Sequence, residues 1–350
     1  MSGFRTIYEN LKRYRHIIKL WYYLKFPVKD KVILLGTPEH NNIGDSAIVI
    51  AEINLFKTFF PNSNVKEITF DEYEIYRNKI RKYASKSNLI ICHGGGNIGN
   101  IWRGLEENRY KVLSDFPQTP TIIMPQTVYF TDEEDGKIAI EKSKTFYDKA
   151  KQLTITAREK TSYDILNTLY TTPQKLLTPD VVLSTTMRDY GISAGKRMGG
   201  LLVFRNDKER AMTDSSREFV ISWLNRKGIN YRITDMYSDE PVSKKNRKML
   251  VKNKMQEFAN AEFVITDRLH GMIFSAISGT PCIALDNNHH KVKGTYEWIS
   301  NLPYIKYVDN IDKINLYLPE LVKMQSCCYD NKAIIENFEP LIKEIGRYVN

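Results

Sequence analysis

Apolar and polar positions alternate along the first half of the chain in a way that predicts a repeated strand–helix order. Short apolar runs of the kind that form buried strands occur at 31–37, 65–70, 88–94, 121–126 and 153–159. Between them, apolar residues recur at helical spacing near 45–59, 72–84, 102–113, 132–150 and 160–169. Strands that alternate with helices in this way form parallel βαβ units.

The alternation pauses once and then starts again. Residues 185–199 are polar, contain glycines and begin no apolar run, so we interpret them as a linker. Apolar runs then resume at 200–205, 230–236, 262–268, 281–286 and 304–309. We therefore predict an α/β fold with two tandem Rossmann-like domains and a ligand cleft between them.

This organisation gives a division of the whole chain. It begins with a basic amphipathic helix in residues 1–30 and ends with a helix in 329–350 that returns across the first domain. The first Rossmann-like domain covers 31–184, and the second, after the linker, covers 200–328.

Composition and charge narrow the class of protein. The chain has 350 residues, of which 42% are hydrophobic and 26% charged, as in a folded protein of two domains or one large domain. Its net charge of +10 comes mainly from residues 1–31 and 241–254. Two local basic patches without a nucleic-acid-binding motif argue against a nucleic-acid partner. With no membrane-length apolar run, no signal-peptide pattern and no CxxC among four cysteines, we expect a cytoplasmic protein.

The N-terminal segment has a pattern of its own. Apolar residues recur at helical spacing from Phe4 to Trp21, with basic residues between them. Such a helix either packs on the body of the protein or lies on an anionic membrane surface. The sequence leaves both alternatives open, so peripheral membrane contact through residues 4–24 is one expectation.

Two turns of the first half carry candidate binding groups. Asp45 follows the first strand, where doubly wound folds bind ligands, although it or Ser46 can also simply cap the next helix. In the sequence HGGGNIGNIW (93–102), Gly95, Gly96 and Asn97 follow an apolar strand. Backbone N–H groups exposed near a helix start bind anions. The alternative is that the glycines only allow a close strand–helix approach.

Cations and a histidine stand at other predicted strand ends. Arg158 suits a phosphate or carboxylate, and its alternative is an ion pair with Glu159 or another neighbour. Arg268 and His270 are two residues apart, so they share a face if the strand continues through them. Together they supply an anion clamp and a proton donor, while the alternative for His270 is packing. Lys291 lies in the loop 286–298 with further charged and histidine residues.

Other catalytic patterns are absent or misplaced in the sequence. HGGG (93–96) and GISAG (191–195) imitate parts of an esterase, but Ser193 lies inside the predicted linker rather than after a buried strand. The chain contains no HExxH, EF-hand, Walker A or DxD motif, so we expect no required metal.

Seven motifs follow one another along the chain: NIGD (42–45), CHGGGNIGNIW (92–102), MPQTVYF (124–130), TAREKTSY (156–163), LTPDVVL (177–183), DRLHG (267–271) and DNNHHKVKGTYEW (286–298). Taken in this order, they resemble the polysaccharide pyruvyl transferase family. The resemblance covers roughly residues 31–300. It implies a GT-B-like arrangement and transfer of a pyruvyl group from phosphoenolpyruvate to a sugar of an exopolysaccharide or capsule precursor, soluble or lipid-linked. It implies no cofactor beyond that donor substrate.

The resemblance also implies roles for individual residues. Arg158 and Arg268 match the family's anion-binding positions, and His270 matches its histidine, which serves acid chemistry or phosphate departure. Lys291 is a further phosphate contact, while Gly95, Gly96 and Asn97 would hold an anion or a sugar hydroxyl. We assign Asp45 as the candidate base for the acceptor hydroxyl.

Two other functions compete with pyruvyl transfer. A GT-B-type glycosyltransferase that uses a nucleotide sugar would share the fold, with Asp286 available for the ribose. A membrane-attached saccharide-binding protein would explain the basic N-terminus, but not Arg158, Arg268 and His270 together.

Overall fold

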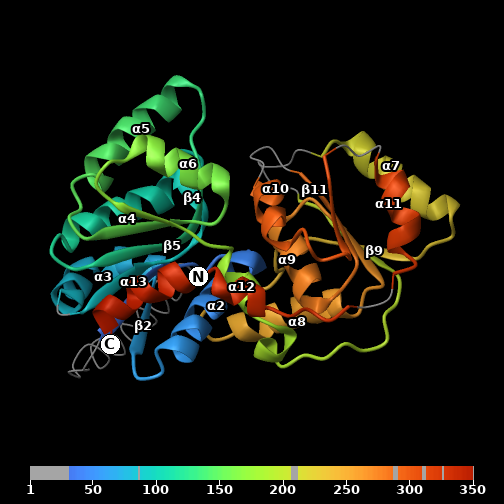
Figure 1. Cartoon of the computed structure of the whole chain (residues 1–350), viewed down its shortest axis with the longest axis horizontal. Coiled ribbons are helices and arrows are strands. Elements are labelled where there is room, and N and C mark those ends of the chain that lie inside the picture. Colours follow the sequence, from blue (N-terminus) through green and yellow to red (C-terminus); the bar gives the residue numbers. More distant parts are fainter. Residues whose placement is uncertain are drawn as a thin grey trace, which may run out of the picture.

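Two parallel β-sheets, each part of its own lobe, form the framework of the molecule (Figure 1). The computed structural model describes residues 31–85, 87–205, 212–286, 291–309, 313–324 and 327–349. The amphipathic segment 4–24 lies outside these residues. No helix in the described ranges combines the length and the apolar character that crossing a membrane requires.

The first sheet follows a doubly wound order. Its central path within the described residues is β2 (Asn64–Thr69), β1 (Lys31–Thr37), β3 (Leu89–Cys92), β5 (Thr121–Tyr129), β6 (Leu153–Ala157) and β7 (Gln174–Leu177), and β4 (Gly95–Gly99) also pairs with β5. Neighbouring residues of β1 face opposite sides, since Val32 and Leu34 join one apolar cluster and Ile33 and Leu35 join another. Both faces of the sheet are therefore buried, which explains the unbroken apolar runs in the sequence.

The second sheet is also doubly wound, with fewer strands. Its order is β12 (Ile305–Val308), β11 (Cys282–Leu285), β10 (Phe263–Thr266), β8 (Gly200–Val203) and β9 (Tyr231–Thr234). In each sheet the strand order reverses next to the first strand, between β1 and β3 and between β8 and β10. Ligands of doubly wound folds bind at the carboxyl ends of the strands at such reversal points.

Helices connect the strands of both sheets. Those of the first half are α2 (Ile43–Phe59), α3 (Phe70–Ala84), α4 (Arg103–Asp115), α5 (Glu134–Tyr147), α6 (Lys160–Leu169) and the 3₁₀ turns η1 (Val181–Ser184) and η2 (Met187–Tyr190). Those of the second half are α7 (Asp214–Arg226), α8 (Arg247–Ala259), α9 (Leu269–Ser278), α10 (Lys291–Tyr296), η3 (Glu297–Ile299), α11 (Ile314–Leu321), α12 (Lys332–Glu336) and α13 (Glu339–Val349).

The sequence pattern predicted most of these elements correctly. Strand β1 and helix α6 have the predicted bounds, and the other predicted strands and the helices predicted near 45–59, 72–84, 102–113 and 132–150 are confirmed with small shifts at their ends. The single helix predicted at 329–350 is instead two helices, α12 and α13, and the helix predicted in residues 1–30 lies outside the described residues. Two strands were not predicted. Strand β7 follows α6, and β4 occupies Gly95–Gly99, where the sequence indicated a turn opening a helix.

The two lobes share one apolar core. Val32 of β1, Val264 of β10 and Ile345 of α13 belong to the same buried cluster. Helices α2 and α8 pack against each other between the lobes, and Figure 1 shows the C-terminal α13 (red) lying across the first lobe. The Glu344 carboxylate on α13 accepts a hydrogen bond from the Thr154 hydroxyl on β6, 3.3 Å away.

Residues between the two sheets are ordered against the second lobe. Tyr190 of η2 is buried, and the Arg197 guanidinium donates to the carbonyl oxygen of Ala261 at 3.0 Å and to that of Ser278 at 2.9 Å. Residues 187–198 are thus fixed by contacts of their own, and the domain bounds given above stay a prediction.

Candidate active site

The site is built where the reversal points of the two sheets meet. The loop after β1 leads into α2, and the loop after β10 leads into α9. Gly44 in the first turn of α2 faces His270 in the first turn of α9 so closely that a Cβ on Gly44 would lie 2.4 Å from Nδ1 of His270. Only glycine allows this contact, so the two helix starts bring both lobes to one point.

Asp45 does not cap α2, contrary to one sequence interpretation. Asn42 is the cap, because its Oδ1 accepts from the backbone N–H of Gly44 at 2.9 Å. The Nδ2 of Asn42 also donates to Asp45 Oδ2 at 2.9 Å, and His40 Nε2 lies 3.5 Å from the same oxygen. Asp45 is therefore a partly exposed carboxylate held in the first turn of α2, and it acts electrostatically on His270.

Arg158 lies at the centre of a buried polar cluster. Its Nη1 donates to Asp180 Oδ2 at 2.8 Å, and its Nε donates to the Thr127 hydroxyl at 2.8 Å. Glu159 is the second acidic neighbour, at 3.6 Å from Nε. The ion pair left open by the sequence is therefore present, mainly with Asp180. The guanidinium also borders β4, since a Cβ on Gly96 would lie 2.8 Å from Nη2.

His270 shares Asp180 with Arg158. Its Nε2 lies 3.7 Å from Asp180 Oδ2 and has no hydrogen-bond partner among the described residues. Burial lowers the pKa of His270 below its ordinary value, and the positive charge of Arg158 adds to this effect against the opposing influence of Asp180 and Asp45. The imidazole is therefore neutral at pH 7 in the unliganded protein.

Arg268 is not on the same strand face as His270, contrary to the sequence expectation. Strand β10 ends at Thr266, and Arg268 is the residue before α9 while His270 lies within its first turn. Arg268 instead forms a bidentate pair with Asp235, with Nε–Oδ1 and Nη2–Oδ2 distances of 2.7 and 2.8 Å. Its guanidinium also lies 5.8 Å from the ring centroid of Tyr237.

The glycine-rich segment is a strand rather than an open anion-binding turn. Two of its N–H groups are already bonded, Gly94 to Glu52 Oε1 at 2.8 Å and Asn97 to Gln126 Oε1 at 3.2 Å. The glycines let the chain approach β5, because a Cβ on Gly99 would lie 1.7 Å from the Tyr129 carbonyl oxygen. The close approach is therefore to a strand and not to a helix, as the sequence alternative had it, and the anion-binding role of this segment stays a prediction.

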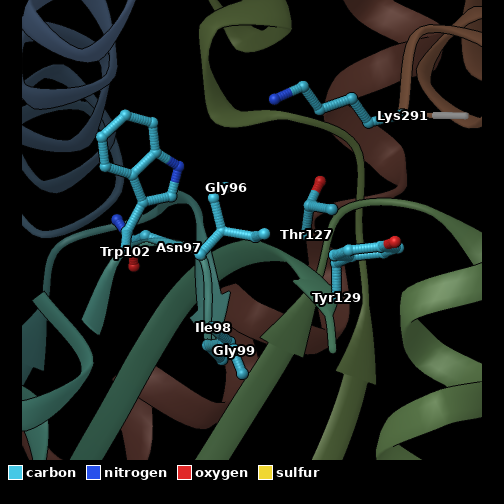
Figure 2. Close-up of a pocket in the computed structure, with 9 residues that line it drawn as sticks. Gly96, Asn97, Ile98, Gly99, Trp102, Thr127, Tyr129 and Lys291 are labelled. Carbon is cyan, nitrogen blue, oxygen red and sulfur yellow. The ribbon is translucent and has the colours of Figure 1, made fainter. Parts of the chain in front are cut away.

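A pocket opens beside this strand and includes three predicted site residues, Gly96, Asn97 and Lys291 (Figure 2). It encloses about 290 Å³, part of it open to solvent. Trp102, Thr127 and Tyr129 line it as well. Gly95, with a φ of 129°, belongs to the strand but not to the lining.

The second lobe closes onto the first at Arg158 and Glu159. The Trp298 indole N–H in η3 donates to the carbonyl oxygen of Arg158 at 2.8 Å. Gly294 of α10 lies so close to Glu159 that a Cβ there would be 2.7 Å from the Glu159 Cβ. These contacts fix α10, and with it Lys291, beside the cluster around Arg158.

Sequence reasoning missed Asp180 and Thr127, and it named Glu159 only as an alternative ion-pair partner of Arg158. Asp180 Oδ1 accepts from the Val182 N–H at 2.9 Å, so in sequence it looks like an ordinary cap before an apolar run. Thr127 donates its hydroxyl to Glu159 Oε2 at 3.1 Å. Burial raises the pKa of Glu159, although Arg158 opposes the shift. Only the packing of β5, α6 and η1 shows that these residues surround one guanidinium.

Known structures and sequences that are similar to this chain indicate its fold and its family. UDP-GlcNAc 2-epimerase from Methanocaldococcus jannaschii matches with a TM-score of 0.52 and 14% identity, over 91% of this chain and all (100%) of that one. That likeness shows the fold alone, two Rossmann-like domains in a GT-B-like architecture. A family model described as polysaccharide pyruvyl transferase matches residues 42–289.

Two curated relatives cover most of the chain. General stress protein 30 of Bacillus subtilis is 32% identical over 323 residues, 90% of this chain and 91% of that protein. Pyruvyl transferase 1 of Schizosaccharomyces pombe is 28% identical over 272 residues, 74% of this chain and 66% of that protein.

Fold and site together define a protein of GT-B-like architecture with a polar cluster shared between its two lobes. Within that class, the chain belongs to the polysaccharide pyruvyl transferase family.

Proposed function

We propose that this enzyme transfers the pyruvyl group of phosphoenolpyruvate to a sugar of a surface-polysaccharide precursor, forms a pyruvate ketal and releases phosphate. The observation that carries the proposal is the convergence of Arg158 and His270, from different lobes, on the Asp180 carboxylate. Lys291 stands on the adjoining pocket wall. A donor with a carboxylate and a phosphate needs more than one cation in one cleft.

The donor would bind by replacing an existing ion pair. Arg158 is balanced by Asp180 in the unliganded protein, and its planar fork fits a carboxylate or phosphate in the same way. Lys291 supplies a second positive charge nearby. Arg268 supplies a third positive charge, and its bidentate contact with Asp235 orients it just before the start of α9.

Ketal formation then requires two proton transfers. One sugar hydroxyl bonds to C2 of the enol phosphate while C3 gains a proton and becomes a methyl group. The C2–O bond to phosphate breaks, a second hydroxyl of the same sugar bonds to C2, and its proton leaves with the phosphate. The two hydroxyl protons thus balance the methyl group and the released hydrogen phosphate. We assign His270 to one of these transfers and Asp45 to activation of the acceptor hydroxyl.

The test is direct product analysis. Candidate saccharides incubated with phosphoenolpyruvate and the enzyme should gain a pyruvyl ketal by mass spectrometry, with one phosphate released for each. Release of phosphate from phosphoenolpyruvate without a pyruvyl group added to the sugar would contradict the proposal.

A thermal-shift comparison separates the glycosyltransferase alternative. A ligand bound only by the folded state stabilises it by about 2.7 kcal/mol at 100 times its Kd. Phosphoenolpyruvate should raise the melting temperature, whereas UDP and GDP should not. The reverse pattern would favour a nucleotide-sugar enzyme.

We also propose that the enzyme works in the cytoplasm at the inner face of the membrane, on a lipid-linked acceptor, through residues 4–24. Basic residues near an anionic surface contribute about 1 kcal/mol each, and salt screens them over ~10 Å at 0.1 M. Deletion of residues 1–28 should spare activity on a soluble saccharide and reduce it on a lipid-linked one. If the intact protein fails to pellet with anionic vesicles at low salt, this part of the proposal is wrong.

A further inference from the structure

The pocket beside β4 has two kinds of lining that suit two different chemical groups. Its inner wall adjoins charged residues, because Gly96 touches the Arg158 guanidinium and Lys291 lies above it. Its outer part is formed by Trp102 and Tyr129. In Figure 2, Trp102 stands on one side of the Gly96–Gly99 strand, and Tyr129 stands on the other.

Strand β4 forms one wall of the pocket. Its glycines pack closely on neighbouring groups, Gly96 on the Arg158 guanidinium and Gly99 on the Tyr129 carbonyl oxygen. The N–H of Asn97 is bonded to Gln126, which removes it as an anion donor. Among the described residues that line the pocket, Lys291 carries the charge, so the part formed by Trp102 and Tyr129 is neutral.

A neutral space with aromatic walls is a poor place for an anion and a good place for a sugar ring. The C–H faces of a pyranose are apolar and stack on aromatic rings, while its hydroxyls meet the polar ends of tryptophan and tyrosine. The pocket is partly open to solvent, so a sugar ring can enter it while the rest of a saccharide stays outside.

We propose that Trp102, Tyr129 and the glycine strand β4 form the subsite for the acceptor pyranose, next to the donor position at Arg158 and Lys291. This inference rests on the proposed function, because it names which wall of the same cleft takes the sugar. It reassigns Gly96 and Asn97 from the donor to the acceptor. The subsite places a ring hydroxyl near the inner wall, where the pyruvyl carbon would be held.

Trp102→Ala tests the subsite, with Trp102→Phe as the conservative variant and Trp223→Phe on α7 as a matched control in the other lobe. We expect Trp102→Ala to raise the acceptor KM at least roughly tenfold. The phosphoenolpyruvate-induced thermal shift should stay unchanged, since that ligand binds the inner wall. Trp102→Phe should recover most of the loss, and Trp223→Phe should match the wild type.

Binding measured without turnover keeps this inference separate from the proposed function. The probes are three methyl hexopyranosides, of gluco, galacto and manno configuration, followed by saturation-transfer NMR. Saturation concentrated on one C–H face, lost in Trp102→Ala and kept in Trp102→Phe, supports the subsite even if no pyruvyl group is transferred. Pyruvyl transfer with an unchanged acceptor KM in Trp102→Ala overturns the subsite and leaves the proposed function intact.

Discussion

At the scale of single residues, Asp180 contacts side chains from both lobes. It is buried with Arg158 as an ion pair and lies 3.7 Å from His270. Asp180→Asn leaves the Arg158 charge buried without its main counterion, so the unliganded variant should lose about 3–5 kcal/mol of stability. Phosphoenolpyruvate restores a negative charge there, so it should raise the melting temperature more in the variant than in the wild type.

Differential scanning fluorimetry with and without phosphoenolpyruvate measures both effects. Asp132→Asn, an exposed position before α5, is the matched control and should change neither value. An equal ligand-induced shift in Asp180→Asn and wild type would show that the donor does not meet Arg158.

The titration of His270 predicts how donor binding changes with pH. Burial lowers its pKa, so it is neutral in the unliganded enzyme, with Asp180, Asp45, Arg158 and Lys291 acting on it. An anionic donor favours the charged imidazole and raises this pKa, so binding should take up a proton and weaken as pH rises. Calorimetry in buffers of different ionisation enthalpy measures the uptake.

The matched variant for this measurement is His270→Asn, which removes the titrating group but keeps a polar side chain. Its proton uptake should fall to that of the donor phosphate alone. Turnover of His270→Ala should fall by ~10²–10⁴-fold, the usual contribution of a general acid or base. Identical proton uptake in His270→Asn and wild type would remove His270 from the donor site.

At this scale the sequence predicted some residues and could not predict others. Arg158 and His270 stand out because each follows an apolar strand, Arg158 directly after β6 and His270 in the first turn of the helix after β10. Asp180 does not, because its contact with His270 joins positions 90 residues apart and one of its oxygens serves an ordinary cap. A short polar residue with a local role gives no sequence signal for its long-range partner.

At the scale of elements, the close contact of α2 with α9 sets the position of His270. A Cβ on Gly44 would lie 2.4 Å from the imidazole, so Gly44→Ala must displace His270 or separate the two helices. We expect at least a tenfold loss of turnover, which corresponds to about 1.4 kcal/mol in the activation barrier. Steady-state kinetics with circular dichroism melting measures both consequences.

Gly104→Ala is the control, since nothing lies within 4 Å of a Cβ there. It is exposed in α4, so alanine should stabilise the helix by roughly 0.5–1 kcal/mol and leave turnover unchanged. Full activity in Gly44→Ala would mean that the position of His270 is not critical.

Element prediction succeeded where one periodicity dominated. Strand β1 and helix α6 agree with their predicted bounds because continuous apolar runs and helical spacing leave little choice. Strand β4 was missed, since GGNIG carries almost no strand propensity and pairs only because its glycines fit against β5. Tertiary contact, rather than local preference, makes that segment a strand.

At the scale of the whole molecule, the basic patch 241–254 joins the two lobes. The sequence showed only a local excess of charge there, with no partner. In the structure, Arg247 donates to Glu67 Oε1 and to the Pro38 carbonyl oxygen, both at 2.7 Å, and Lys244 pairs with Glu72. These contacts hold the loop before α8 against β2 and against the β1–α2 loop. The β1–α2 loop leads into the first turn of α2, which contains Asp45.

Arg247 is buried, so its loss should be costly. Burial alone would raise the pKa of Glu67, but Arg247 outweighs burial and holds that pKa below its ordinary value. A lowered carboxyl pKa stabilises the fold above the unfolded value and loses that effect as pH falls. Arg247→Met should therefore cost about 3 kcal/mol at pH 7, and the difference from wild type should shrink below about pH 4.

Urea unfolding at the two pH values measures this difference. Lys343→Met is the control, since Lys343 pairs with Glu339 on the exposed side of α13 and should unfold like the wild type at pH 7. An equal loss in Arg247→Met at both pH values would assign the stability to packing. A pH-dependent loss instead means that an ion pair fixes how the lobes meet, and hence how His270 reaches Asp180 across the cleft.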